Sequence, residues 1–88
     1  MKVLILEQTN ELAELLGLYL TSLSGAEVVA THLVQEALPQ ITEGKFDVFM
    51  CEMSYTRAGN DLVLRTWRST HPGIPVVLVG EGAAPEGT

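Results

Sequence analysis

The residues of this chain that are suited to nucleophilic or metal chemistry are few and scattered. The single cysteine, Cys51, lies in the apolar run 48–51, which favours a small core residue over a nucleophile and excludes an internal disulfide. His32 and His71 lie far apart without the cysteine spacing of a zinc site, so we interpret them as surface or helix-end residues. No local pattern indicates a Ser-His-Asp or Cys-His catalytic set. The sequence therefore predicts no metal site and no cofactor.

Composition points to one small folded domain. The 88 residues are 47% hydrophobic and 18% charged, with a mean hydropathy of +0.24. Five Lys and Arg against eleven Asp and Glu give a net charge of −6, so direct binding to nucleic acid or to an anionic membrane surface is not expected. No apolar stretch approaches the roughly 20 residues of a membrane span. Together with the single cysteine, these features favour a cytoplasmic location.

Four strands alternating with three helices are expected. Segments rich in apolar residues at 3–6, 28–30, 46–51 and 74–79 predict strands, and apolar residues on both parities are typical of strands that are buried on both faces, as in a parallel sheet. The helix after the first strand ends at Gly25 and carries an apolar stripe at helical spacing: Leu12, Leu15, Leu16, Tyr19, Leu20 and Leu23. The alternation predicts an α/β fold built from right-handed parallel βαβ units.

Three segments, MKVLILE at 1–7, FDVFMCE at 46–52 and THPGIPVV at 70–77, resemble the receiver domain of bacterial response regulators. The resemblance implies a flavodoxin-like, doubly wound parallel sheet that is truncated after its fourth strand (βαβαβαβ). Residues 1–82 would form this truncated receiver-like domain, and 83–88 would form a flexible C-terminal tail. The strand order of the family, 2-1-3-4-5, is expected for the four strands present.

The resemblance also assigns a pocket. In receiver domains an aspartate that ends the third strand accepts a phosphoryl group, a pair of acids after the first strand holds Mg²⁺, and a hydroxyl residue ends the fourth strand. The corresponding residues here are Glu52, the pair Glu7 and Gln8, and Gly80. Only Glu7 keeps the family's residue type, and the family's lysine lies on a fifth strand that this chain lacks. The resemblance therefore implies a degenerate phosphoacceptor pocket in a pseudo-receiver that is not an enzyme.

Other interpretations of these residues stay open. Glu52 could imitate the phosphorylated state through its longer reach and fixed charge. Alternatively, Glu52 or a neighbouring carboxylate could serve with Mg²⁺ in a working phosphoacceptor. The plainest interpretation is that Glu7 and Glu52 are polar residues facing solvent where loops begin. Arg57, Arg65 and Arg68 fit either a solvated helix face or contact with an acidic partner.

A sheet that stops after four strands is expected to leave one face covered by a single helix. Both parities of the third and fourth strands are apolar, and no charge at 74–79 blunts the exposed edge. Leaving three or four such side chains in water forgoes roughly 1.5–3 kcal/mol each. We therefore expect a homodimer through the fourth-strand edge or the uncovered sheet face. The predicted interface residues are Ile74, Val76, Val77, Leu78 and Val79.

The function expected from these features is a module for protein–protein interaction and dimerisation in bacterial two-component-type signalling. Its expected partners are a second copy of the chain and a signalling protein, with neither nucleic acid nor membrane among them. A small-molecule site at the carboxyl ends of the strands is a third possibility, which rests on fold analogy alone.

Overall fold

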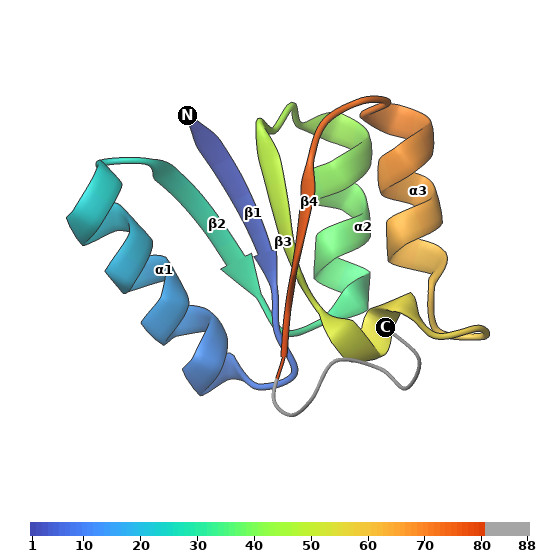
Figure 1. Ribbon diagram of the computed structural model, residues 1–88, viewed down its shortest axis with the longest axis horizontal. Coiled ribbons are helices and arrows are strands. Elements are labelled where there is room, and N and C mark those ends of the chain that lie inside the picture. The colour runs from blue at the N-terminus through green and yellow to red at the C-terminus, as the bar shows by residue number, and fades with distance from the viewer. Residues whose placement is uncertain (81–88) are drawn as a thin grey trace.

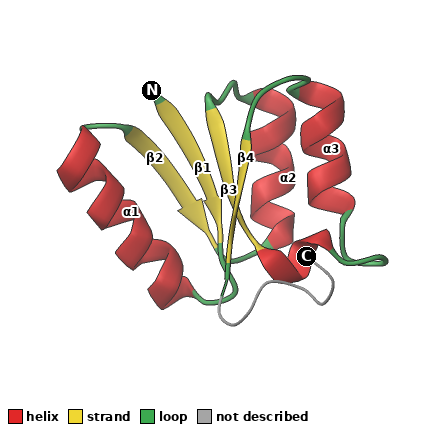
Figure 2. Cartoon of the chain, in the orientation of Figure 1, coloured by secondary structure: helices red, strands yellow, loops and turns green. Residues whose placement is uncertain are grey.

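The computed structural model describes residues 1–80, which form a four-stranded sheet with helices on both faces (Figures 1 and 2). The strands are β1 (Lys2–Leu6), β2 (Glu27–Thr31), β3 (Val48–Glu52) and β4 (Val76–Val79). The helices are α1 (Asn10–Ser24), α2 (Val34–Glu43) and α3 (Leu62–Thr70), with a short 3-10 helix, η1 (Met53–Thr56), after β3. The expected tail 83–88 and the last two residues of the expected domain lie outside the described residues.

The strand order is β2-β1-β3-β4, and every neighbouring pair is parallel. This confirms the predicted α/β class and its βαβαβαβ sequence of elements, and the order is that of the first four strands of a flavodoxin-like sheet. Val3 lies beside both Val28 and Val48, and Met50 lies beside Val77. Because side chains alternate along each strand, these residues share one face of the sheet, and their sequence neighbours share the other.

Helix α1 begins and ends at residues suited to those positions. The hydroxyl of Thr9 accepts a hydrogen bond from the backbone N–H of Leu12 at 3.2 Å, which caps the first turn. Gly25 ends the helix in the left-handed conformation, with φ of 67°, and its N–H donates to the carbonyl of Thr21. The helix packs on β1 and β2 and buries Ala13 against them.

The apolar stripe of α1 is only partly buried. Leu16 and Leu20 pack on the sheet beside Val3 and Ile5. Four other residues of the stripe have exposed fractions between 44% and 68%, and we call them the exposed flank of α1: Leu12, Leu15, Tyr19 and Leu23. They stay exposed because α1 lies over β1 and β2, and no helix among residues 1–80 lies over the same face of β3 and β4.

The opposite face of the sheet carries the larger core. Helices α2 and α3 pack there and against each other (Figure 1). Trp67 of α3 is fully buried, with its ring 5.1 Å from that of Phe49 and stacked on that of His71 at 4.0 Å. Within the described residues, two helices thus cover one face and one helix covers the other, in agreement with the expectation for four strands.

Two strands begin later than the sequence predicts. β3 begins at Val48 rather than Phe46, because the backbone N–H of Phe46 donates to Nε2 of His71 at 3.2 Å instead of to a neighbouring strand. β4 begins at Val76, directly after Pro75, which has no N–H to contribute to a ladder. Of the two positions expected for His71, surface or helix end, it takes the helix end, where it is buried against Trp67.

Acid is expected to weaken the fold through His71. Burial lowers the pKa of His71 below its usual 6.5, and Nε2 accepts the N–H of Phe46 only while it is unprotonated. The unfolded chain therefore binds this proton more readily, so the contribution of His71 to stability is present above pH 6.5 and is lost as the pH falls from there through the lower pKa of the folded state. We expect a loss of about 1 kcal/mol in the free energy of unfolding.

Urea unfolding of the wild type and of His71→Gln at pH 7 and pH 5 checks this expectation. The variant is expected to be less stable at pH 7 and to lack the part of the pH dependence that comes from the imidazole. The same pH dependence in both proteins would contradict the role assigned to His71.

Candidate functional site

The four residues of the predicted pocket line one cavity, although they come from distant parts of the sequence. The cavity has a volume of about 460 Å³ and lies where α1 begins and β4 ends. We call it the acidic cavity, and its lining consists of Glu7, Gln8, Leu12, Leu15, Leu16, Glu52, Val79 and Gly80. Parallel strands bring these residues together because the carboxyl ends of β1, β3 and β4 meet at one edge of the sheet. The cavity thus combines two carboxylates with an aliphatic wall.

Glu52 is turned toward the residues that follow it. Its carboxylate accepts hydrogen bonds from the backbone N–H of Ser54 at 2.8 Å and from the hydroxyl of the same residue, so Glu52 is the N-cap of η1. The side-chain amide of Gln8 donates to the Ser54 hydroxyl oxygen at 3.2 Å. The carboxylate that the resemblance assigns to the phosphoacceptor position therefore has a structural partner within the chain.

Glu7 is the more deeply buried carboxylate, with only 5% of the residue exposed. Its backbone N–H donates to the carbonyl of Thr31 at 3.1 Å, which fixes the residue at the end of β1. Burial, and then the charge of Glu52, raise the pKa of Glu7. Neither of the two ion pairs found within residues 1–80 involves Glu7 or Glu52. The acidic cavity therefore concentrates negative charge without a cation from this part of the chain.

Gly80 lies against the side chain of Met53. A Cβ atom at residue 80 would lie 3.1 Å from Cγ of Met53, which is closer than ordinary van der Waals contact. A serine or threonine there would require Met53 to shift. The space that a hydroxyl side chain at residue 80 would need is thus occupied in part by the thioether side chain of Met53.

The polar side chains of the acidic cavity are not suited to the Mg²⁺ site that the resemblance to receiver domains implies. Mg²⁺ requires near-octahedral oxygen ligands, whereas Glu52 is held by Ser54 and Gln8 directs its NH₂ group to the same residue. Within residues 1–80, no three His, Cys, Asp or Glu side chains come together as a metal site. An organic cation such as an ammonium or guanidinium group fits the pair Glu7 and Glu52 better, because it brings its own hydrogen-bond donors.

Glu7→Gln is expected to stabilise the fold at neutral pH. Burial and the charge of Glu52 raise the pKa of Glu7 above its usual 4.5, so the charged form is less favourable in the folded chain than in the unfolded one. The stability contributed by the neutral form is fully present below pH 4.5 and is lost as the pH rises through the raised pKa. In urea unfolding at pH 7 the variant should gain roughly 0.5–1 kcal/mol, and the gain should shrink in acid. Glu14→Gln is the control, because Glu14 is an exposed carboxylate of α1 away from the helix C-terminus and outside the acidic cavity, and a gain of the same size there would contradict the interpretation.

The cysteine adjoining this site is expected to be inert. Cys51 is fully buried, and burial, followed by the charges of Glu52 and Glu7, raises the pKa of its thiol from 9.0 to about 12. This rise in the thiol pKa reduces the thiolate fraction at pH 8 by about a thousandfold. Iodoacetamide should therefore leave the folded chain unmodified for hours and alkylate it within minutes in urea, as followed by mass spectrometry. Alkylation of the folded chain at the rate of a free thiol would contradict this expectation.

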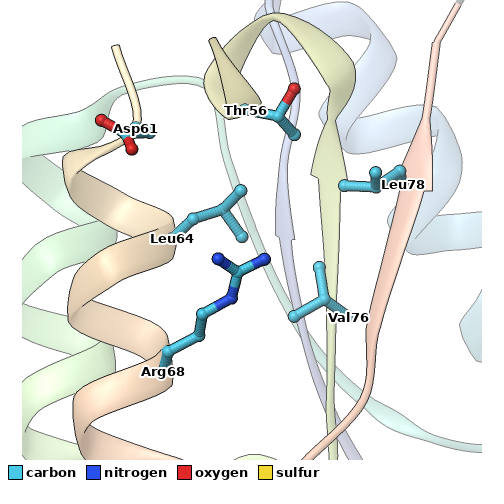
Figure 3. A pocket seen from close by; sticks show the side chains of 6 residues that line it. All are labelled: Thr56, Asp61, Leu64, Arg68, Val76 and Leu78. Carbon is cyan, nitrogen blue, oxygen red and sulfur yellow. The ribbon is translucent and has the colours of Figure 1, made fainter. Parts of the chain in front are cut away.

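A second cavity, of about 230 Å³, lies on the opposite face of the sheet between α3 and β4 (Figure 3). Its lining consists of Thr56, Asp61, Leu64, Arg68, Val76 and Leu78. Figure 3 shows the guanidinium of Arg68 extending from α3 toward β4. Asp61 pairs instead with Arg65, one turn along the helix, at 3.4 Å. The exposed cation of Arg68 therefore lines this cavity together with Val76 and Leu78 of β4.

The five predicted interface residues lie on β4 or just before it. Val77 and Leu78 are the most exposed of them, at 43% and 49%. Val76 and Val79 are half-buried, and the carbonyl of Ile74 accepts a hydrogen bond from the indole of Trp67 at 3.4 Å. β4 pairs with β3 only, so no strand within residues 1–80 lies along its outer edge.

Sequence reasoning missed two features of the site. The exposed flank of α1 was included in an apolar stripe without a partner being assigned to it, although α1 carries more large apolar residues than one contact with a sheet uses. Ser54 was not identified either, and its only sequence signal is a hydroxyl two residues after Glu52.

Within residues 1–80, no helix has the length and hydropathy needed to span a bilayer.

No protein-family model matches the sequence, and no curated protein matches it. The resemblance to receiver domains therefore rests on the residues of this chain.

Proposed function

We propose that this chain is a non-phosphorylatable pseudo-receiver that acts as a self-associating interaction module in bacterial two-component-type signalling, in the cytoplasm. The parallel order β2-β1-β3-β4 and the meeting of Glu7 with Glu52 at the carboxyl edge support the resemblance to receiver domains. The observation that carries the proposal is β4, an uncharged and exposed strand whose outer edge is paired with no strand among residues 1–80.

The acidic cavity supports a module without phosphoryl transfer. An in-line phosphoacceptor needs a free carboxylate and cationic or metal stabilisation of the transferred group. Glu52 instead caps η1 through Ser54, and Met53 crowds the position of Gly80. These contacts make Glu52 a structural residue of the η1 turn.

Self-association is proposed to occur by pairing of β4 edges across a two-fold axis, which would join two sheets into one. Residues 74–79 carry no charge, so two copies of the strand can approach without repulsion. Packing of the uncovered face against its own copy is the other arrangement that the sequence leaves open, and it would cover Val77 without pairing the outer edge of β4. Pairing at the edge satisfies backbone donors and acceptors and covers part of Val77 and Leu78.

Incubation with Mg²⁺ and acetyl phosphate tests the absence of phosphoryl transfer. Intact-mass spectrometry is expected to find the unmodified chain, and fluorine NMR with beryllofluoride is expected to find no bound signal. A stoichiometric, Mg²⁺-dependent adduct that disappears in Glu52→Gln and persists in Glu43→Gln would overturn this part of the proposal. It would instead support a working phosphoacceptor.

A further inference from the structure

We propose that the acidic cavity and the exposed flank of α1 form one groove that binds a positively charged amphipathic helix of a partner protein. This inference rests on the proposed function and names the class of partner that such a module would bind. It assigns the groove a different occupant from the β4 edge, where the second copy of the chain is proposed to pair.

The floor and one wall of the groove are apolar. Leu12 and Leu15 line the acidic cavity opposite Val79. Tyr19 and Leu23 follow at helical spacing on the same side of α1, so they extend the wall beyond the cavity. From residue 12 to residue 23 this wall is about 16 Å long, which matches three turns of a docked helix.

The sheet continues the apolar surface away from α1. Met50 and Val77 are neighbours in register and belong to the face on which α1 lies. Val77 has 43% of its surface exposed, and Met50 is half-buried. A helix lying beside α1 would cover both residues, as apolar grooves cover amphipathic helices in other complexes.

The carboxyl end of the groove is negatively charged. Glu7 is 5% exposed and has no cation from residues 1–80, and Glu52 lines the same cavity. Glu11, in the first turn of α1, adds a third carboxylate beside the apolar wall. A buried carboxylate next to a second one calls for an ammonium or guanidinium group at this end.

The chain itself does not offer that cation. Its five basic residues are absent from α1 and β4, and they are Lys2, Lys45, Arg57, Arg65 and Arg68. Lys2 pairs with Glu27 at 3.6 Å, and Arg65 pairs with Asp61. Residues 81–88 contain two Glu and no Lys or Arg. A second copy related by a two-fold axis through the groove would bring the same acids to it. The occupant that complements both the charge and the apolar wall of the groove is a basic helix of another protein.

Binding of synthetic helices to the full 88-residue chain tests the inference. The probe is a fluorescein-labelled peptide of about 15 residues of Leu, Ala and Lys, with Leu at i, i+3, i+4 and i+7. The comparison peptide has the same Leu positions and Glu in place of Lys. Fluorescence anisotropy at physiological salt is expected to find saturable binding of the Lys peptide, one per chain, and affinity at least about tenfold lower for the Glu peptide.

Two pairs of variants locate the site. Leu15→Ala should weaken binding of the Lys peptide by about tenfold, whereas Leu18→Ala should change it by less than about twofold. Leu18 is the matched control because it is a similarly exposed leucine of α1 that lines a different cavity, next to Val28 and Ala30. Glu7→Gln should weaken binding by about fivefold or more, and Glu43→Gln, with the same change of net charge, should not.

Equal affinities for the two peptides, or equal effects of the two members of either variant pair, would overturn the inference and leave only attraction to a chain of net charge −6. Light scattering on the same samples separates this result from the proposed self-association. If the chain dimerises but does not bind the Lys peptide, the proposed groove is wrong and the proposed dimer stands. If the chain binds the peptide as a monomer, the proposed dimer is wrong and the groove stands.

Discussion

Trp67→Ala is expected to lower the free energy of unfolding by about 3–5 kcal/mol, the largest loss expected for a single substitution in this chain. The side chain is fully buried between Phe49 and His71, and its indole N–H donates to the carbonyl of Ile74. Truncation of a buried tryptophan costs about 3–5 kcal/mol, out of a total stability of roughly 5–15 kcal/mol for a domain. The cost is large here because Trp67 is the residue on which α3, β3 and the segment before β4 converge.

Urea unfolding followed by circular dichroism measures this effect. Leu18→Ala, which truncates a side chain that is 69% exposed, should stay within about 0.5 kcal/mol of the wild type. A loss below about 1 kcal/mol for Trp67→Ala would mean that α3 is not packed as described, because no well-filled site could tolerate the cavity left behind.

Leu78→Lys is expected to convert the proposed dimer into a folded monomer. Leu78 is 49% exposed on the open strand, so a lysine there can reach water in the isolated chain. In edge-to-edge pairing, both copies would carry the new charge close to the two-fold axis. Lysine at an edge strand is a device by which natural sheets avoid pairing, and we expect dimerisation to weaken by about a hundredfold or more.

Light scattering across a range of concentrations measures this loss, with circular dichroism to verify that the variant is folded. Leu18→Lys is the control, because it adds the same charge at an exposed leucine far from β4. A Leu78→Lys dimer as tight as the wild type would exclude the β4 edge and leave the uncovered face as the interface.

The fold could be predicted from the sequence because each strand carries its signal locally. Apolar residues on both parities of 3–6 and 46–51 are compatible with a sheet covered by helices on two sides, and that is what forms. Errors arose where a distant residue intervenes. His71 accepts a hydrogen bond from the N–H of Phe46, which lies 25 positions earlier in the sequence, and no local sequence pattern indicates that contact.

For the pocket, only the identity of four lining residues could be predicted. The order of the strands sufficed to bring Glu7, Gln8, Glu52 and Gly80 to one edge. What the side chains do there depends on neighbours that the sequence pattern does not specify. Glu52 turns toward Ser54, and Glu7 is buried beside it, so two carboxylates of one kind acquire different environments.

The extent to which α1 is buried could likewise not be predicted from local sequence patterns. Helical spacing identifies which residues share a side of the helix, but not how far that side reaches over the sheet. Because α1 lies over β1 and β2, Leu15 and Tyr19 are left on the side toward β4. The same offset creates the groove assigned above to a basic helix.

Amide hydrogen exchange of β4 at two protein concentrations tests the central claim, pairing of β4 edges, most directly. Amides that face away from β3 exchange freely in a monomer and are protected only if a second strand accepts their hydrogen bonds. We predict that protection within residues 76–79 rises with concentration in the wild type and stays low in Leu78→Lys. Exchange in β4 that is independent of concentration, in a chain that sediments as a folded monomer at about 100 µM, would contradict the account.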